Sequence, residues 1–99
     1  MKELTLGQIV ATKGIVDEMN ETYGFREFCM HCLLRHRALD WGDVPEEDKL
    51  TNDQALEVDA RVLSAYTIPT YFRLAYAEKI WIITEADRSA TTILFPHEY

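Results

Sequence analysis

Two short apolar runs near the end of the chain form its clearest pattern of hydrophobic and polar positions. The first covers residues 80–83 and the second covers residues 91–95, and both are rich in the β-branched and aromatic residues that favour strands. A polar stretch at 85–89 separates the runs, and Pro96 ends the second. Two strands joined by a short polar loop predict an antiparallel β-hairpin.

The pattern upstream of this hairpin predicts helices first and one or two more strands after them. Apolar residues recur at helical spacing before residue 38, and Thr12 stands where it could cap the first helix. Pro45 and the three acids behind it are typical of the start of a third helix. Residues 70–78 fit either a strand or a loop with aromatic anchors. The other expected elements are a short strand or extended segment within 4–12, helices at 13–20, 25–38 and 45–58, and a strand at 61–68.

This order of elements predicts one α+β domain over residues 1–99, with N-terminal helices packed on a mostly antiparallel sheet of three or four strands. Ninety-nine residues support a single modest core. No apolar run approaches the roughly 18 residues that span a bilayer, and the N-terminus lacks the features of a signal peptide. We therefore expect a cytoplasmic protein that does not enter a membrane.

The charge is concentrated in one segment, which changes the functional picture. The net charge is −7, and segment 40–59 alone, with eight acids and Lys49 as its one base, also carries −7. Such a surface repels phosphate backbones but suits a basic protein surface, including one that normally holds nucleic acid. The predicted binding residues are Asp40, Asp43, Glu46, Glu47, Asp48 and Asp53. A solvated helix that keeps the protein soluble explains the same charge.

A Cys-x-x-Cys pair, Cys29 and Cys32, is followed by His36 and suggests a metal site, because zinc binds cysteine and histidine side chains. All three residues share one face of the predicted second helix. That face is also the apolar stripe of the helix, where free cysteines pack as small hydrophobic residues. Packed thiols are therefore favoured over a metal or redox site, and we expect no cofactor.

The hairpin loop suggests an enzyme as the alternative. Glu85 could move a proton, and Arg88 could steady a developing negative charge on a phosphodiester. Ordinary turn chemistry explains the same residues, since loop carboxylates bond to the backbone or pair with an arginine. His36 could likewise act as a base, or simply bond to a neighbouring aspartate such as Asp43. The catalytic residues of a ribonuclease would be His36, Arg61, Glu85 and Arg88.

Several short motifs carry a family resemblance. They are DWGD at 40–43, ND-x-AL at 52–56, R-x-LSAY at 61–66, IITEADRS at 82–89, TTIL at 91–94 and Pro96. Together they resemble a family of short bacterial proteins that are labelled hypothetical or plasmid-related and occur on chromosomes and mobile elements. The resemblance implies a bacterial or mobile-element origin and implies no activity. The chain departs from the family pattern at 67–78, where the relatives have a shorter connection.

Two functions from different classes follow. The favoured one is a small acidic protein that binds another protein through segment 40–59, such as a component of a restriction or CRISPR complex. The alternative is a small ribonuclease toxin, because RelE- and barnase-like nucleases also combine helices with an antiparallel sheet. The acidic composition counts against direct nucleic-acid binding. A homodimer is a further expectation if Tyr71 and Phe72 are exposed.

Overall fold

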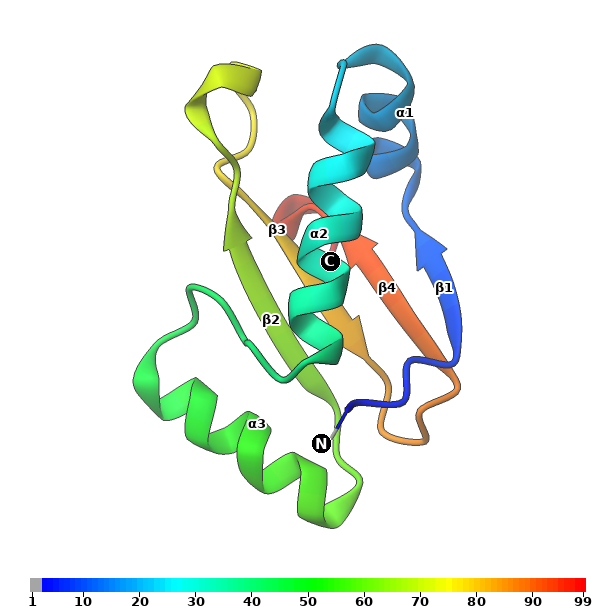
Figure 1. Cartoon of the computed structure of the whole chain (residues 1–99), viewed down its shortest axis with the longest axis vertical. Coiled ribbons are helices and arrows are strands. Elements are labelled where there is room, and N and C mark those ends of the chain that lie inside the picture. Colours follow the sequence, from blue (N-terminus) through cyan, green and yellow to red (C-terminus); the bar gives the residue numbers. More distant parts are fainter. Residues whose placement is uncertain (1–2) are drawn as a thin grey trace.

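The structure, a computed structural model, describes residues 3–99 and confirms the α+β fold class (Figure 1). The elements are β1 (Gln8–Ala11), α1 (Lys13–Glu21), α2 (Phe25–Arg37), α3 (Glu46–Val58), β2 (Val62–Thr67), the 3-10 helix η1 (Thr70–Phe72), β3 (Lys79–Thr84), β4 (Ala90–Leu94) and the 3-10 helix η2 (Pro96–Glu98). The predicted helices and strands are present, and the ambiguous segment 70–78 forms η1 and a loop. Within residues 3–99, no helix has the length and apolar character to cross a bilayer.

The four-stranded sheet is mixed and has the strand order β1-β4-β3-β2. β3 pairs antiparallel with both β2 and β4, which confirms the predicted hairpin. β1 pairs parallel with β4, so the first and last strands of the chain lie side by side at one edge (Figure 1). The local pattern of β1 does not reveal this pairing, because its partner residues lie at the other end of the chain.

The main core lies between one face of the sheet and the helices α1 and α2. Alternation along β3 turns Ile80 and Ile82 toward this face, where the apolar stripe of α2 meets them. The cysteines of that stripe are free thiols that are fully buried. The buried residues of this core are Ile15, Phe25, Cys29, Cys32, Tyr66, Ile68, Ile80, Ile82, Ile93 and Phe95.

The start of α1 is held by Glu98. Thr12 occupies the N-cap position, but its hydroxyl donates to Glu98 Oε1 at 2.5 Å and makes no side-chain cap bond. The Glu98 carboxylate also accepts the backbone N–H groups of Gly14 and Phe95 at 2.9 and 3.0 Å. Thr12 is thus the N-cap residue, as predicted, but its side chain makes no cap bond, because a carboxylate far along the chain binds its hydroxyl instead. A negative charge there also suits the positive end of the helix dipole.

The opposite face of the sheet is covered in part. The alternation that buries Ile80 and Ile82 turns Leu63 and Trp81 to this second face. The end of the chain crosses it beyond η2, and the ring centroids of Trp81 and Tyr99 lie 5.8 Å apart. A second core joins α3 and the loop before it to β2, and its buried residues are Leu4, Trp41, Val44, Ala55, Val62 and Ala65. Trp41 is 4% exposed there, so its side chain belongs to this second core.

Candidate functional site

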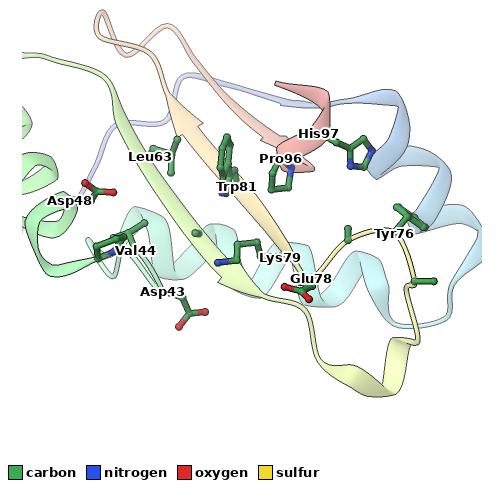
Figure 2. A pocket seen from close by; sticks show the side chains of 14 residues that line it. Asp43, Val44, Asp48, Leu63, Tyr76, Glu78, Lys79, Trp81, Pro96 and His97 are labelled. Atoms are coloured by element: carbon green, nitrogen blue, oxygen red, sulfur yellow. The ribbon is translucent and has the colours of Figure 1, made fainter.

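A groove of about 620 Å³ lies on this second face (Figure 2). Leu63, Ala65 and Trp81 contribute its apolar lining from neighbouring strands. The loop before α3 borders one side of the groove, and the loop at 75–78 borders it together with the start of η2. Figure 2 shows Trp81 in the middle, with the end of the groove next to α3 on one side of it and His97 on the other. The groove therefore joins an apolar surface to the acidic segment 40–59.

Three carboxylates and one ammonium group line the groove, from Asp43, Asp48, Glu78 and Lys79. Thr67 donates its backbone N–H and its hydroxyl to Asp43 Oδ2, both at 2.8 Å. These two bonds hold the pKa of Asp43 below its ordinary value, so its carboxylate is charged and oriented at neutral pH. Among residues 3–99, Asp48 and Glu78 have no side-chain partner. The four groups together carry a negative charge.

The outer edge of β2 beside this groove is already closed. Asn52 accepts the N–H of Leu63 at 3.2 Å and donates to its carbonyl at 2.8 Å. Ala65 donates its N–H to the carbonyl of Trp41 at 3.2 Å, and its own carbonyl accepts the N–H of Asp43 at 2.7 Å. Residues 41–43 and Asn52 thus use the hydrogen-bonding groups that an added strand would need. A ligand in the groove must be recognised by side chains.

Gly42 permits this close approach. Its φ is +73°, and a Cβ at this position would stand 2.1 Å from the carbonyl oxygen of Ala65. Only glycine avoids both the strained backbone angle and the clash. The DWGD motif is therefore explained by the closure of the β2 edge.

α3 presents most of the acidic segment to solvent. Its buried residues are Asn52 and Ala55, so the helix contacts the rest of the molecule through a narrow face. Glu46 and Glu47 are exposed on the rest of its surface, and so are the apolar side chains of Leu50 and Val58, at 62% and 72%. This outward face of α3 therefore combines negative charge with apolar contact area.

The predicted binding residues divide into two groups. Asp40 forms an ion pair with Arg35 at 2.7 Å, and Asp53 accepts the indole N–H of Trp41 at 2.9 Å. These two carboxylates thus have partners within the molecule. Glu47 and Asp48 form no ion pair with any residue of 3–99, and the partner of Glu46 is the half-exposed Lys49 at 3.3 Å. The four acids on or next to the first turn of α3, Asp43, Glu46, Glu47 and Asp48, are the stronger candidates.

His36 lies in a buried chain of hydrogen bonds. Its Nδ1 is 2.6 Å from Ser64 Oγ, and its Nε2 is 2.8 Å from Thr84 Oγ1. Thr84 Oγ1 is 2.7 Å from Thr91 Oγ1, and Thr91 donates to the carbonyl of Leu6 at 2.7 Å. Because each hydroxyl has one proton, Thr84 must donate to Thr91, and the Nε2–H of His36 must donate to Thr84. Nδ1 then accepts from Ser64, and the imidazole is neutral.

These surroundings make His36 a structural residue. Burial, with the nearby charge of Arg88, lowers its pKa to about 4, and its side chain is fully buried. A base in that place cannot reach a substrate. Neither ring nitrogen is left for the neighbouring aspartate that the sequence suggested, because Ser64 and Thr84 bind both.

Cys29, Cys32 and His36 do not form a metal site in this fold. Burial raises the pKa of both thiols to about 12, whereas a metal binds the thiolate. Both nitrogens of His36 are bound to hydroxyls, as described above. Within residues 3–99, no group of three or more His, Cys, Asp or Glu side chains is placed to hold a metal ion.

The other residues of the ribonuclease alternative make contacts that ordinary turn and helix packing explains. The Arg88 guanidinium donates to the backbone carbonyls of Ala55 and Ala60 near the end of α3 and, within its own loop, to that of Glu85. The guanidinium of Arg61 lies over the Tyr99 ring at 5.4 Å from its centroid, and Glu85 is exposed in the loop between β3 and β4. None of the four candidate catalytic residues, His36, Arg61, Glu85 and Arg88, lines the groove. The structure therefore does not assemble the four residues into one site.

Trp81 and Glu78 are site residues that the sequence reasoning missed. Lys79 and Trp81 alternate with Ile80 and Ile82, and a period of two places this pair on the face opposite the isoleucines. That alternation was the available signal for a lined second face. The position of Glu78 beside this face follows from the 68–78 loop, which has no such period.

Comparison of the chain with protein-family models, curated proteins and solved structures finds no match. The resemblance to plasmid-related bacterial proteins therefore stays a prediction. Function has to be argued from the groove and the outward face of α3.

Proposed function

We propose that this protein acts by binding another protein through the acidic end of the molecule. The observation that carries the proposal is the outward face of α3, where Glu46 and Glu47 lie one turn from the exposed side chain of Leu50, and Val58 is exposed at the other end of the helix. Exposed carboxylates steer and orient a basic partner, and exposed apolar side chains add contact area when they are covered.

The partner we propose is a protein that handles nucleic acid, such as a component of a restriction or CRISPR complex. Such proteins hold phosphate backbones on basic surfaces. A rigid helix with several carboxylates presents the same sign of charge at similar density, so it competes for the same surface. The resemblance to proteins of mobile elements is consistent with this class of partner.

The test is capture from a bacterial lysate with the tagged protein and two charge-reversal variants. The first variant carries Glu46→Lys, Glu47→Lys and Asp48→Lys. The control carries Glu21→Lys, Glu27→Lys and Glu85→Lys, which are exposed acids outside segment 40–59 and give the same change in net charge. We expect a stoichiometric partner with wild type and with the control, and its loss with the first variant.

Two further observations complete this test. Light scattering on the purified chain reports self-association, for which Tyr71 is the exposed aromatic candidate at 74%, whereas Phe72 packs against the main core. Circular dichroism must show that all variants are folded. Capture that survives reversal of the α3 acids would reject the proposal and leave those acids as a solvated surface.

A further inference from the structure

We infer that the groove binds an arginine-bearing segment of the partner, with one guanidinium group seated on Trp81 between the carboxylates of Asp48 and Glu78. This inference rests on the proposed function, because it assigns the partner a second contact next to α3. It adds the chemistry by which the partner is recognised.

The apolar lining of the groove suits the flat face of a guanidinium. Trp81 and Leu63 lie on the sheet face opposite α1 and α2, and Trp81 is partly exposed in the groove. Indole is the most favourable aromatic partner for a cation, and arginine stacks on it while its N–H groups stay free to bind oxygen. Leu63, which lines the groove with the indole, offers an apolar contact to a residue next to that arginine in the partner.

The charges around the groove select a cation over an anion. Asp43, Asp48 and Glu78 line it, and Lys79 is the opposing charge. Asp43 is fixed in orientation by Thr67, so it loses little conformational entropy when it accepts a hydrogen bond. Asp48 and Glu78 lack side-chain partners among residues 3–99, so a ligand does not have to break an existing ion pair to reach them.

The closed edge of β2 decides between side-chain recognition and strand addition. The outward groups of Leu63 and Ala65 are already bound by Asn52 and by the segment 41–43. A bound segment therefore gains its specificity from its side chains, and its backbone contributes little. This predicts that a neutral analogue of arginine will not substitute for it.

The experiment uses two short synthetic peptides and nitrogen-15 NMR on the full chain. In the first peptide arginine and leucine alternate, and in the second each arginine is replaced by citrulline, which has nearly the same shape without the charge. We expect the arginine peptide to shift the indole N–H signal of Trp81 and the amides of Leu63 and Ala65. The indole of Trp41, which is buried and bound to Asp53, is the internal reference.

A matched pair of variants locates the charge that matters. Asp48→Asn with Glu78→Gln neutralises the groove, and Glu46→Gln with Glu47→Gln makes the same charge change on the outward face of α3. We expect the groove pair to weaken binding of the arginine peptide about tenfold and the α3 pair to leave it nearly unchanged. The citrulline peptide should bind neither the groove pair nor the α3 pair.

Several outcomes would overturn the inference. It falls if neither peptide shifts Trp81, if citrulline binds as well as arginine, or if the α3 pair weakens binding as much as the groove pair. Capture from lysate with the same variants separates the two proposals. Loss of the partner with the α3 pair, together with no peptide signal in the groove, would keep the proposed function and reject the arginine site. If the arginine peptide shifts the NMR signals of the groove while no variant affects capture, the arginine site would be kept and the proposed function rejected.

Discussion

His36 shows at the scale of one residue how chemistry suggested by sequence becomes structure. The side chain is a good general base in isolation, but here it is buried and bound by Ser64 and Thr84. The carbonyl of Leu6 can only accept, and this fixes the directions of the bonds through Thr91 and Thr84 to the Nε2–H of His36. Burial lowers the pKa of His36, so Nδ1 is unprotonated at neutral pH and accepts from Ser64. The residue stabilises the contact between α2 and the sheet.

Protonation of His36 should destabilise the protein in mildly acidic solution. Burial lowers the pKa of the folded side chain to about 4 from an ordinary value of 6.5, so the unfolded chain binds more protons between these values. The contribution of His36 is fully present above pH 6.5 and is lost as the pH falls toward 4. We expect it to cost up to about 3 kcal/mol of unfolding free energy, measured by urea denaturation across this range.

A direct titration separates this effect from that of the carboxylates. The pKa of Asp43 is also held below its ordinary value, so its stabilising bonds weaken as the solution becomes acidic. The imidazole signals of His36 in NMR report its own protonation whatever the other groups do. A midpoint near 6.5 in the folded protein would show that burial does not lower the pKa of His36, and would remove the expected loss of stability.

Arg88 acts at the scale of an element, because it ties the β3–β4 loop to α3. Its Nη1 donates to the carbonyl of Ala60 at 2.6 Å, and its Nη2 donates to the carbonyl of Ala55 at 3.2 Å. The Ala55 carbonyl also accepts the backbone N–H of Ala60, so Arg88 adds a further bond at the C-terminal end of α3, where a cation suits the helix dipole. The ITEADRS motif thus forms a tight loop that holds the end of the acidic helix.

Removal of the Arg88 side chain should loosen α3 without affecting the sheet. Arg88→Ala loses three hydrogen bonds from the guanidinium, to the carbonyls of Ala55, Ala60 and Glu85, and we expect it to cost about 1–3 kcal/mol in urea denaturation. Arg88 has a φ of +61°, which glycine adopts without strain, so Arg88→Gly should be less destabilising than Arg88→Ala by up to about 1 kcal/mol. Hydrogen exchange should accelerate in the last turn of α3.

Arg61→Ala is the control for this prediction. Arg61 is exposed and contacts the ring of Tyr99, so its loss should cost well under 1 kcal/mol. Equal effects of the two alanine variants would show that the contacts of Arg88 with α3 contribute no stability.

The elements that sequence predicts well are those whose signal is local. Helical spacing identified α2, and β-branched runs identified β3 and β4, because burial on one face repeats with the period of each structure. Asn52 could not be recognised as a cover for the edge of β2, nor Glu98 as the cap of α1. Both roles depend on which distant backbone groups are left unpaired after folding. The groove was missed for the same reason, since its lining comes from four separated stretches of the chain.

The whole molecule separates its charge along its length. It measures 38 Å along its longest axis, and α3 lies at one end of that axis (Figure 1). Because segment 40–59 carries the entire net charge of −7, the remaining residues balance to zero. The negative electrostatic potential of the protein is therefore strongest at the end that carries α3. A basic partner that approaches in solution is oriented toward α3 and the groove beside it.

This asymmetry predicts how the captured partner will bind in solution. Steering acts before contact and is screened by salt, so the association rate constant should fall about tenfold or more between about 0.05 and about 0.5 M NaCl. Reversal of Glu46, Glu47 and Asp48 should lower the rate and remove most of its salt dependence. The control reversal of Glu21, Glu27 and Glu85 changes the net charge equally but leaves the acidic end intact, so a steep dependence should remain. Stopped-flow mixing measures all three proteins, and equal salt dependence for the two variants would show that net charge alone, and not its placement on α3, governs association.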